Sequence, residues 1–350
     1  MSSQLGIDRG NSYLDSISAS LGHAIPSEVS QAQVVPLNAL AADPGLCVLN
    51  LSELLTRDFP EREPILSPWL LTQSLTMIHA WRGIGKTHMA LGIAFAVATA
   101  GKFLTWEAPT ARRVLYIDGE MPAAAIRDRL KALVEGDDRE FDPARLLILT
   151  PDAQVGPMPD LATREGQAAI EAIVAANGVE LIIVDNISTL CRDTGGSEND
   201  AESWRGPQEW ALRMRRLGRS ILFIHHSGKG GGQRGSSKRE DTLDVVIKLQ
   251  RPSDYQPEQD ARFEIHFEKY RNGAGDNAKP MEATLGKDGN GQACWTWRSV
   301  EESTYDRVVA MADEGFRPAE IAQELGINKS NVSRHMKRAR LEGRISGGKP

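Results

Sequence analysis

The chain has 350 residues, of which 41% are hydrophobic and 25% are charged. These proportions are typical of a globular protein with enough apolar material for a sizeable core, and they exclude fibrous and wholly disordered proteins. With 41 Lys and Arg against 47 Asp and Glu, the formal net charge is −6. A uniformly basic, histone-like protein is therefore excluded, although a local basic patch is not.

The compartment is indicated by the cysteines and by the apolar segments. Cys47, Cys191 and Cys294 are too few and too scattered for a disulfide framework or a zinc site, which favours a reducing compartment. The first residues lack the basic segment and apolar run of a secretory signal. The longest apolar stretch, residues 90–101, is too short to span a membrane. We therefore expect a cytoplasmic protein without a membrane partner.

Residues 1–45 differ in composition from the rest of the chain. They are rich in Ser, Ala, Gln and Pro and show no sustained hydrophobic period. Such a segment predicts a flexible N-terminal arm, with a folded domain beginning at residue 46.

Between residues 74 and 226, short apolar runs alternate with helical patterns. The expected strands are residues 74–80, 113–118, 146–149, 180–185 and 220–225. The expected helices are residues 87–100, 122–134 with Pro122 in the first turn, 162–176 and 204–217. Apolar strands that alternate with helices are typical of a parallel sheet that is buried on both faces. We therefore predict an α/β domain with a mainly parallel sheet over residues 46–300.

After Gly235 the pattern changes. Residues 243–249 and 262–269 are predicted to be antiparallel edge strands, joined by a polar turn that contains proline. Residues 286–291 are rich in Gly, Asp and Asn and predict a hairpin turn. From Ser303 the expected elements are short helices, so residues 303–350 are predicted to form a small all-α domain.

A glycine-rich loop lies between the first strand and the first helix. Residues 80–87 read Ala-Trp-Arg-Gly-Ile-Gly-Lys-Thr, and such a loop can surround a phosphate with backbone N–H groups at a helix N-terminus. Lys86 would reach the β- and γ-phosphates and the Thr87 hydroxyl would bind Mg²⁺, although the full pattern has glycine where this chain has Ala80. The alternative is a plain strand–helix turn with a solvated lysine. The residues expected to bind ATP are Arg82, Gly83, Ile84, Gly85, Lys86, Thr87 and His88.

Two acidic residues lie at the ends of apolar strands. Asp185 ends the run Leu-Ile-Ile-Val-Asp, where a carboxylate can bind Mg²⁺ in this class of site. Glu120 follows Val-Leu-Tyr-Ile-Asp-Gly and therefore lies at the carboxyl end of another strand, the edge at which open α/β sheets bind ligands. A glutamate there can accept a proton from an attacking water. Either acid alone would more often be a solvated strand end, but the adjacent loop favours a functional role.

A third strand ends in two histidines, His225 and His226. Adjacent residues of a strand point to opposite faces, so the pair is not expected to bind one metal ion. One of the two is expected to enter the core. We expect the other, His226, to lie near the γ-phosphate.

Together these motifs resemble the RecA-type ATPases, and among them the plasmid replicative helicases of the RepA type. The resemblance covers about residues 70–285 and includes the later Arg234-Gly-Ser-Ser. It implies that Glu120 is the catalytic base, that Asp185 ends the Walker B strand, and that His226 senses the γ-phosphate. It also implies a ring, usually a hexamer, with ATP bound between subunits.

Such a ring requires a cation from the neighbouring subunit to stabilise charge in the transition state. Arg234 lies in a motif similar to the arginine-finger region of the RepA type. Lys269 and Arg271 lie in Lys-x-Arg-x-Gly, which looks like the strand end that reaches the neighbour's phosphate in bacterial replicative helicases. The sequence does not choose between them, and both are candidates.

The segment 227–239 combines five glycines with four cations. The resemblance implies that this loop faces the central channel, where glycine permits close approach to single-stranded DNA and cations neutralise phosphates. A solvated loop is the alternative. The candidate DNA contacts in this loop are Lys229, Arg234, Lys238 and Arg239.

The C-terminal region has the pattern of a helix-turn-helix, with Gly326 at the turn. Residues 328–350 contain seven Lys and Arg against one Glu, within a chain of net negative charge. We expect Val332 and Met336 to point inward. The alternative is a basic hairpin that packs on another subunit. The residues expected in the major groove of duplex DNA are Asn328, Lys329, Ser330, Asn331 and Arg334.

Three functions fit these features. The first is a DNA-dependent motor, a ring-forming helicase of plasmid or mobile-element replication. The second is a DNA-binding regulator or partition factor that uses ATP as a switch, and the third is a loader of another helicase. A dinucleotide oxidoreductase is disfavoured, because the loop carries Lys-Thr and no acidic ribose-binding residue follows the next strand as expected.

Overall fold

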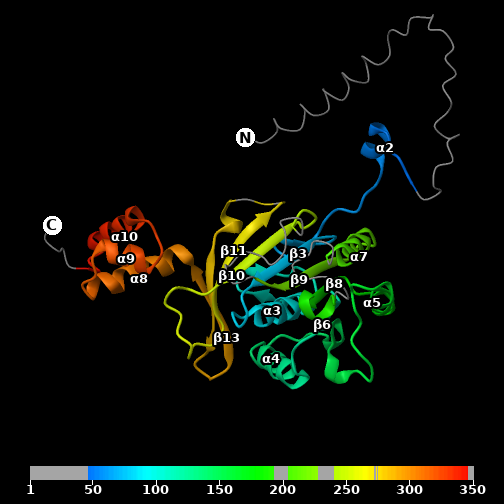
Figure 1. The fold of residues 1–350 in the computed structure, drawn as a ribbon, viewed down its shortest axis with the longest axis horizontal. Helices are drawn as coiled ribbons and strands as arrows, with labels where there is room; N and C mark the ends of the chain where they lie inside the picture. The colour runs from blue at the N-terminus through cyan, green and yellow to red at the C-terminus, as the bar shows by residue number, and fades with distance from the viewer. Residues whose placement is uncertain (1–45, 193–203, 228–239, 272, 274, 346–350) are drawn as a thin grey trace, which may run out of the picture. The chain divides into compact units, whose positions relative to one another are not determined.

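The computed structural model describes residues 46–192, 204–227, 240–271, 273 and 275–345 (Figure 1). The chain divides into two compact units, residues 1–60 and 61–350. The described helix of the first unit is α2 (Leu51–Thr56). It begins in a capping box, in which the side chains of Asn50 and Glu53 each accept the backbone N–H of the other, at 2.9 Å. The predicted arm of residues 1–45 lies outside the described residues.

The centre of the second unit is a nine-stranded sheet. In spatial order its strands are β13 (Ala293–Ser299), β12 (Met281–Lys287), β11 (Arg262–Tyr270), β10 (Val245–Gln250), β3 (Leu75–Ala80), β9 (Ser220–His226), β8 (Leu181–Asp185), β6 (Val114–Asp118) and β7 (Leu146–Leu149). Neighbours from β10 to β7 are parallel, whereas those from β10 to β13 are antiparallel. The predicted α/β fold with a mainly parallel sheet is confirmed.

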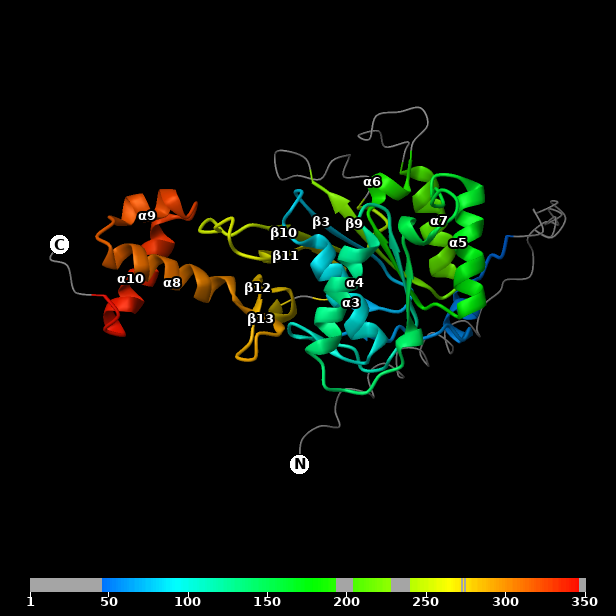
Figure 2. The same cartoon turned by 90° about the horizontal axis from the view of Figure 1, so that it is seen from below.

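Helices cover both faces of the parallel strands (Figure 2). On one face lie α3 (Lys86–Ala98) and α4 (Ala123–Glu135), and on the other lie α5 (Arg164–Asn177) and α7 (Arg205–Arg216). Successive side chains of a strand point to opposite faces, so each central strand contributes to two cores. In β8, for example, Ile183 packs with α3 and Ile182 packs with α5 and α7.

Short elements complete this unit. They are β1 (Pro64–Leu66), β2 (Leu70–Leu71), β4 (Lys102–Phe103), β5 (Trp106–Glu107), α6 (Ile187–Leu190) and the 3₁₀ turns η2 (Pro143–Arg145), η3 (Pro151–Ala153) and η5 (Gly275–Ala278). Among the described helices of the chain, none has the length and apolar character that a membrane crossing requires.

The predicted strands and helices up to residue 226 are found within a few residues of their expected bounds. Two details of the sequence prediction are wrong. Pro122 precedes α4 as its N-cap and is not part of the first turn. The pair β10 and β11 is antiparallel as expected, but β10 also pairs with β3, and β12 and β13 lie outside β11, so the edge on this side is β13. The sequence indicated only the turn of the β12–β13 hairpin, and a turn does not show which strand of the sheet the hairpin pairs with.

Three helices follow the last strand, and they have a hydrophobic cluster of their own. They are α8 (Val300–Asp313), α9 (Pro318–Glu324) and α10 (Lys329–Leu341). Val332 and Met336 are buried in this cluster, as predicted. Gly326 lies between α9 and α10 with φ of +63°, a left-handed conformation that favours glycine. The assignment of α9 and α10 to a helix-turn-helix stays a prediction.

Candidate functional site

The carboxyl ends of the central strands meet at one edge of the sheet. Ala80 of β3 pairs with His226 of β9, and Asp118 of β6 pairs with Asp185 of β8. A cavity of about 410 Å³ lies at this edge, within the usual size of a small-molecule site. The predicted residues that line it are Arg82, Gly83, Ile84, Gly85, Lys86, Thr87, His88, Glu120, Asp185 and His226.

The glycine-rich loop depends on two glycines. Gly83 and Gly85 have φ of +74° and +124°, which other residues rarely adopt. A Cβ atom on Gly85 would lie 2.8 Å from the ring of Phe263 and 3.3 Å from the Cβ of Ala261. Helix α3 begins directly after this loop, so the unpaired N–H groups of its first turn face the cavity as an anion-binding site.

Lys86 is buried at the base of the loop. Its ammonium donates hydrogen bonds to the backbone carbonyls of Ala80 and Trp81, both at 3.0 Å. Burial lowers the pKa of Lys86 to about 8, and the charges of Asp185 and Glu120 oppose this shift. The lysine is therefore cationic at neutral pH, and its present partners are neutral carbonyls that a phosphate can replace.

Asp185 and Thr87 form a pair of oxygen ligands. The phenol of Tyr116 donates to Oδ2 of Asp185 at 2.5 Å, and the Thr87 hydroxyl also donates to this carboxylate. Burial raises the pKa of Asp185, while Tyr116, Thr87 and Lys86 act to lower it. A hydroxyl beside a carboxylate is the donor set that Mg²⁺ prefers, so these residues fit a magnesium ion.

Asp118 supports the turn that carries Glu120, and the sequence interpretation did not single it out. Its carboxylate accepts the N–H groups of Met121 at 3.1 Å and Glu120 at 3.4 Å, and the hydroxyl of Thr150 at 3.3 Å. Burial raises the pKa of Asp118. An acid that ends an apolar strand, as Asp185 also does, was the signal in the sequence, whereas the register of Asp118 with Asp185 is known only from the fold.

Two neighbours orient the carboxylate of Glu120. Nδ2 of Asn186 donates to Oε2 of Glu120 at 2.6 Å, and Nε2 of His226 lies 3.5 Å from the same oxygen. Asn186 is itself fixed, because it caps α6 and accepts the N–H of Thr189 at 3.3 Å. The sequence interpretation missed Asn186, although an asparagine directly after Asp185 at a helix start was a usable signal.

His226 is neutral at physiological pH, because burial lowers its pKa and the nearby charge of Lys86 adds to the effect. Its Nδ1 is buried and has no hydrogen-bond partner among the described residues. The next residue, Ser227, contacts Nδ1 of His79 through its hydroxyl at 2.9 Å, and Nε2 of His79 contacts Glu268 at 2.7 Å. Polar contacts therefore connect the residue after β9 with β3, the strand that precedes the glycine-rich loop, and with β11.

The segment 251–261, between β10 and β11, forms a further side of the cavity, and we call it the pocket wall. Tyr255, Gln259, Asp260 and Ala261 line the cavity from this wall. Arg251 joins the wall to the loop, since its guanidinium donates to the carbonyl of Gly83 at 3.0 Å and lies 4.0 Å from the centre of the Tyr255 ring. The sequence interpretation treated this segment only as a polar turn.

Arg129 of α4 also lines the cavity and was not predicted. Burial lowers the pKa of His88 to about 4, and the charge of Arg129 adds to this effect. His88 is thus neutral at pH 7, and the cations that line this part of the cavity are Arg82, Lys86 and Arg129.

The candidate trans-acting cations lie elsewhere. Lys269 and Arg271 lie at the end of β11, which pairs with the start of β10. The cavity lies at the carboxyl ends of the parallel strands, so these two residues are at the opposite end of the sheet. Lys269 donates to the carbonyl of Glu240, and Arg271 donates to that of Asp241 at 2.9 Å. These two residues are therefore not brought to the cavity of their own chain. Arg234 lies outside the described residues.

The candidate DNA contacts are described only in part. Lys229, Arg234, Lys238 and Arg239 belong to residues 228–239, which lie outside the described residues. At the start of α10, Asn331 is half-buried and four predicted residues are exposed, namely Asn328, Lys329, Ser330 and Arg334.

Comparison with known families identifies the family of the chain. A family model described as an AAA domain matches residues 44–232, more than half of the chain. The chain belongs to this family. Its glycine-rich loop, the Asp185 strand end and the Glu120 turn are the parts of a P-loop ATPase. The match of the AAA domain ends before β10, so the pocket wall and the C-terminal helices lie outside it.

Among solved structures, the chain is similar to a KaiC-like protein from the hyperthermophilic archaeon Pyrococcus horikoshii. The two share 13% sequence identity with a TM-score of 0.47, over 66% of this chain and 93% of that chain.

Proposed function

We propose that this AAA-domain protein is an ATP-dependent DNA-binding motor, a ring-forming helicase that serves the replication of a plasmid or mobile element. The observation that carries the proposal is the position of Glu120, which Asn186 and His226 orient at the mouth of a P-loop cavity. A carboxylate fixed in this way accepts a proton from a water, and this is the chemistry of hydrolysis.

The residues of the site divide the work of hydrolysis. Backbone N–H groups of the loop and of α3 bind the phosphates, and Lys86 exchanges its carbonyl partners for phosphate oxygens. Thr87 and Asp185 would hold Mg²⁺, which neutralises charge on the phosphates when it is bound. Glu120 takes the proton of the attacking water. His226, neutral and in contact with Glu120, is placed to respond to the γ-phosphate.

Assembly into a ring, most simply a hexamer, supplies the remaining cation. Lys269 and Arg271 lie at the sheet edge away from their own cavity, and the Arg271 side chain is 48% exposed. This position supports the proposal that one of them reaches the ATP bound in the cavity of a neighbouring subunit. Arg234 is the other candidate for this role.

DNA is the proposed partner of two regions. Single-stranded DNA would contact the cations of residues 228–239, which directly follow Ser227, the residue after β9. Duplex DNA would contact α10, whose exposed Lys329 and Arg334 belong to the basic C-terminal stretch.

A second candidate is a regulator, partition factor or loader that binds duplex DNA and uses ATP as a switch without unwinding. The basic C-terminal helices favour it, because a module suited to duplex DNA is not needed for movement along a single strand.

ATP turnover without DNA, with single-stranded DNA and with duplex DNA separates the two candidates. Strong stimulation by single strands supports the motor, and strand displacement is then the next assay. Stimulation by duplex alone, or none, supports the regulator. Turnover that persists in Lys86→Ala would contradict the assignment of the site itself.

A further inference from the structure

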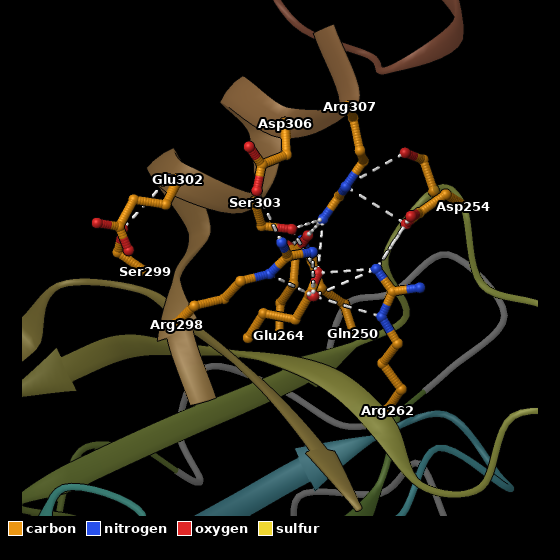
Figure 3. A network of polar contacts seen from close by, with 12 residues as sticks. Gln250, Asp254, Arg262, Glu264, Arg298, Ser299, Glu302, Ser303, Asp306 and Arg307 are labelled. Atoms are coloured by element: carbon orange, nitrogen blue, oxygen red, sulfur yellow. Dashed lines mark hydrogen bonds and ion pairs between the residues drawn. The ribbon is translucent and has the colours of Figure 1, made fainter. Parts of the chain in front are cut away.

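A cluster of charged side chains lies between α8 and the antiparallel strands (Figure 3). We call it the α8 network. Its members come from β11, β12, the end of β13 and α8, and they are Arg262, Glu264, Glu282, Arg298, Ser303 and Arg307.

Glu282 is the centre of the network. Its side chain is only 2% exposed, and it accepts hydrogen bonds from Ser303 and Arg307 of α8, both at 2.7 Å. Arg298 and Arg262 donate to the same carboxylate at 3.0 and 3.2 Å. A buried carboxylate that is surrounded by three guanidinium groups accepts few alternative geometries, so it fixes α8 against β12.

Two arginines extend the network to the pocket wall. Arg262 donates to both carboxylate oxygens of Asp254 at 3.0 Å and to the side chain of Gln259 at 3.2 Å. Arg307 lies 3.4 Å from Asp254 and donates to the Ser253 hydroxyl at 3.3 Å. Gln259 lines the cavity, so these contacts run from α8 to a residue that faces the nucleotide site.

The pocket wall in turn rests on the P-loop. Arg251 donates to the carbonyl of Gly83, and Gly85 packs against Ala261 and Phe263 so closely that no side chain fits there. The other side of α8 contributes Tyr305 and Val308 to the core that α10 shares. Contacts therefore continue from the P-loop through the wall and α8 to the proposed DNA-binding helix.

We propose that the α8 network couples the nucleotide pocket to the C-terminal helices. Arg262 and Arg307 are positioning residues that set the pocket wall through Asp254. Because coupling between two binding sites is reciprocal, nucleotide binding and duplex binding change each other's affinity by the same factor. The duplex half of this inference rests on the proposed function, whereas the nucleotide half needs only an ATP site.

A matched pair of substitutions in the full chain tests the proposal. Asp254→Asn removes the carboxylate of the wall that both arginines contact. Asp306→Asn removes a carboxylate that contacts Arg298 and Arg344 but no wall residue. The two side chains are 40% and 44% exposed, and Arg262 and Arg307 keep Glu282 as a partner when Asp254 is changed. The first measurement is the Kd of a non-hydrolysable ATP analogue in the presence of Mg²⁺, with and without a short duplex. The second is the KM and kcat of ATP turnover.

We expect Asp254→Asn to weaken nucleotide binding about fivefold, to raise KM with little change in kcat, and to reduce the effect of nucleotide on duplex affinity. Asp306→Asn should keep the native nucleotide Kd, KM and kcat. The two variants should have similar melting temperatures. Equal losses in both variants, or an unchanged nucleotide Kd in Asp254→Asn, overturn the proposal. If the native chain binds no duplex, the proposed function of α10 fails, and the nucleotide Kd values still decide the coupling to α8.

Discussion

The parallel and antiparallel parts of the sheet carry their polar residues in different places. In the parallel strands β6, β8 and β9, helices cover both faces, and the acids and histidine of the site stand at the strand ends. In the antiparallel strands β11 and β12, Glu264 and Glu282 lie within the strands and meet α8 across one face. The residues of the nucleotide site thus lie at the ends of parallel strands, whereas the residues that hold α8 lie along the face of antiparallel strands.

The largest expected effect comes from an end residue. Glu120→Gln removes the proton acceptor and keeps the shape, so turnover falls by about 10²–10⁴-fold while nucleotide affinity stays near the native value. Stopped-flow turnover and equilibrium binding measure the two quantities. Glu165→Gln, an exposed change on α5, is the control. Retained turnover in Glu120→Gln would remove Glu120 from the role of base.

A face residue is expected to affect stability most. Glu282→Gln leaves three arginines around a neutral amide in a buried cluster, which costs about 3–5 kcal/mol of unfolding free energy. Chemical denaturation measures this change. A loss below about 1 kcal/mol would mean that solvent, not Glu282, compensates the guanidinium groups.

The pH dependence of nucleotide binding tests a charge of the site, the buried ammonium of Lys86 at the start of α3. The pKa of Lys86 is lowered to about 8, so the ammonium is charged below this pH and neutral above it. ATP affinity should therefore fall by up to tenfold per unit above about pH 8, as one proton is taken up on binding. Calorimetry across this range measures the slope, and a constant Kd would contradict the assigned contact with phosphate.

The smallest expected effect on stability has the opposite sign to that of Glu282→Gln. Burial raises the pKa of Asp185 above its unfolded value, so its protonated form favours folding, and this contribution is lost as the pH rises through the folded pKa. Ionisation of Asp185 is therefore less favourable in the folded apo protein than in the unfolded chain. Asp185→Asn should raise the melting temperature by a few degrees and abolish Mg²⁺-dependent turnover.

Tyr116→Phe serves as the companion variant for Asp185→Asn. It leaves the charge and removes a donor, so it should lower the melting temperature. Destabilisation by both substitutions would show that Asp185 stabilises the fold at neutral pH.

The sequence was sufficient for those parts of the molecule whose signal is local. The glycine-rich loop, Asp185 and Glu120 each follow an apolar strand directly, and parallel strand ends meet at one edge whatever the strand order. Asn186 and Asp118 were as local, but their roles depend on the register between β6 and β8.

The pocket wall and the α8 network were not predictable in this way. Arg307 meets Glu282 across 25 positions of sequence, and Arg251 meets Gly83 across 168. Such pairs form only because β10 pairs with β3 and the β12–β13 hairpin extends the sheet beyond β11. Strand order of this kind comes from packing between distant elements and leaves no pattern within either element.

The hydrogen bond from Lys86 to the carbonyl of Trp81 has an optical consequence. Trp81 belongs to the P-loop itself and is 38% exposed, so its indole is in contact with solvent beside the loop. When Lys86 turns from this carbonyl to a phosphate, the surroundings of the indole change with it. One of the seven tryptophans of the chain thus lies in the P-loop, and a change of tryptophan emission that Trp81→Phe removes would time the arrival of nucleotide without any label.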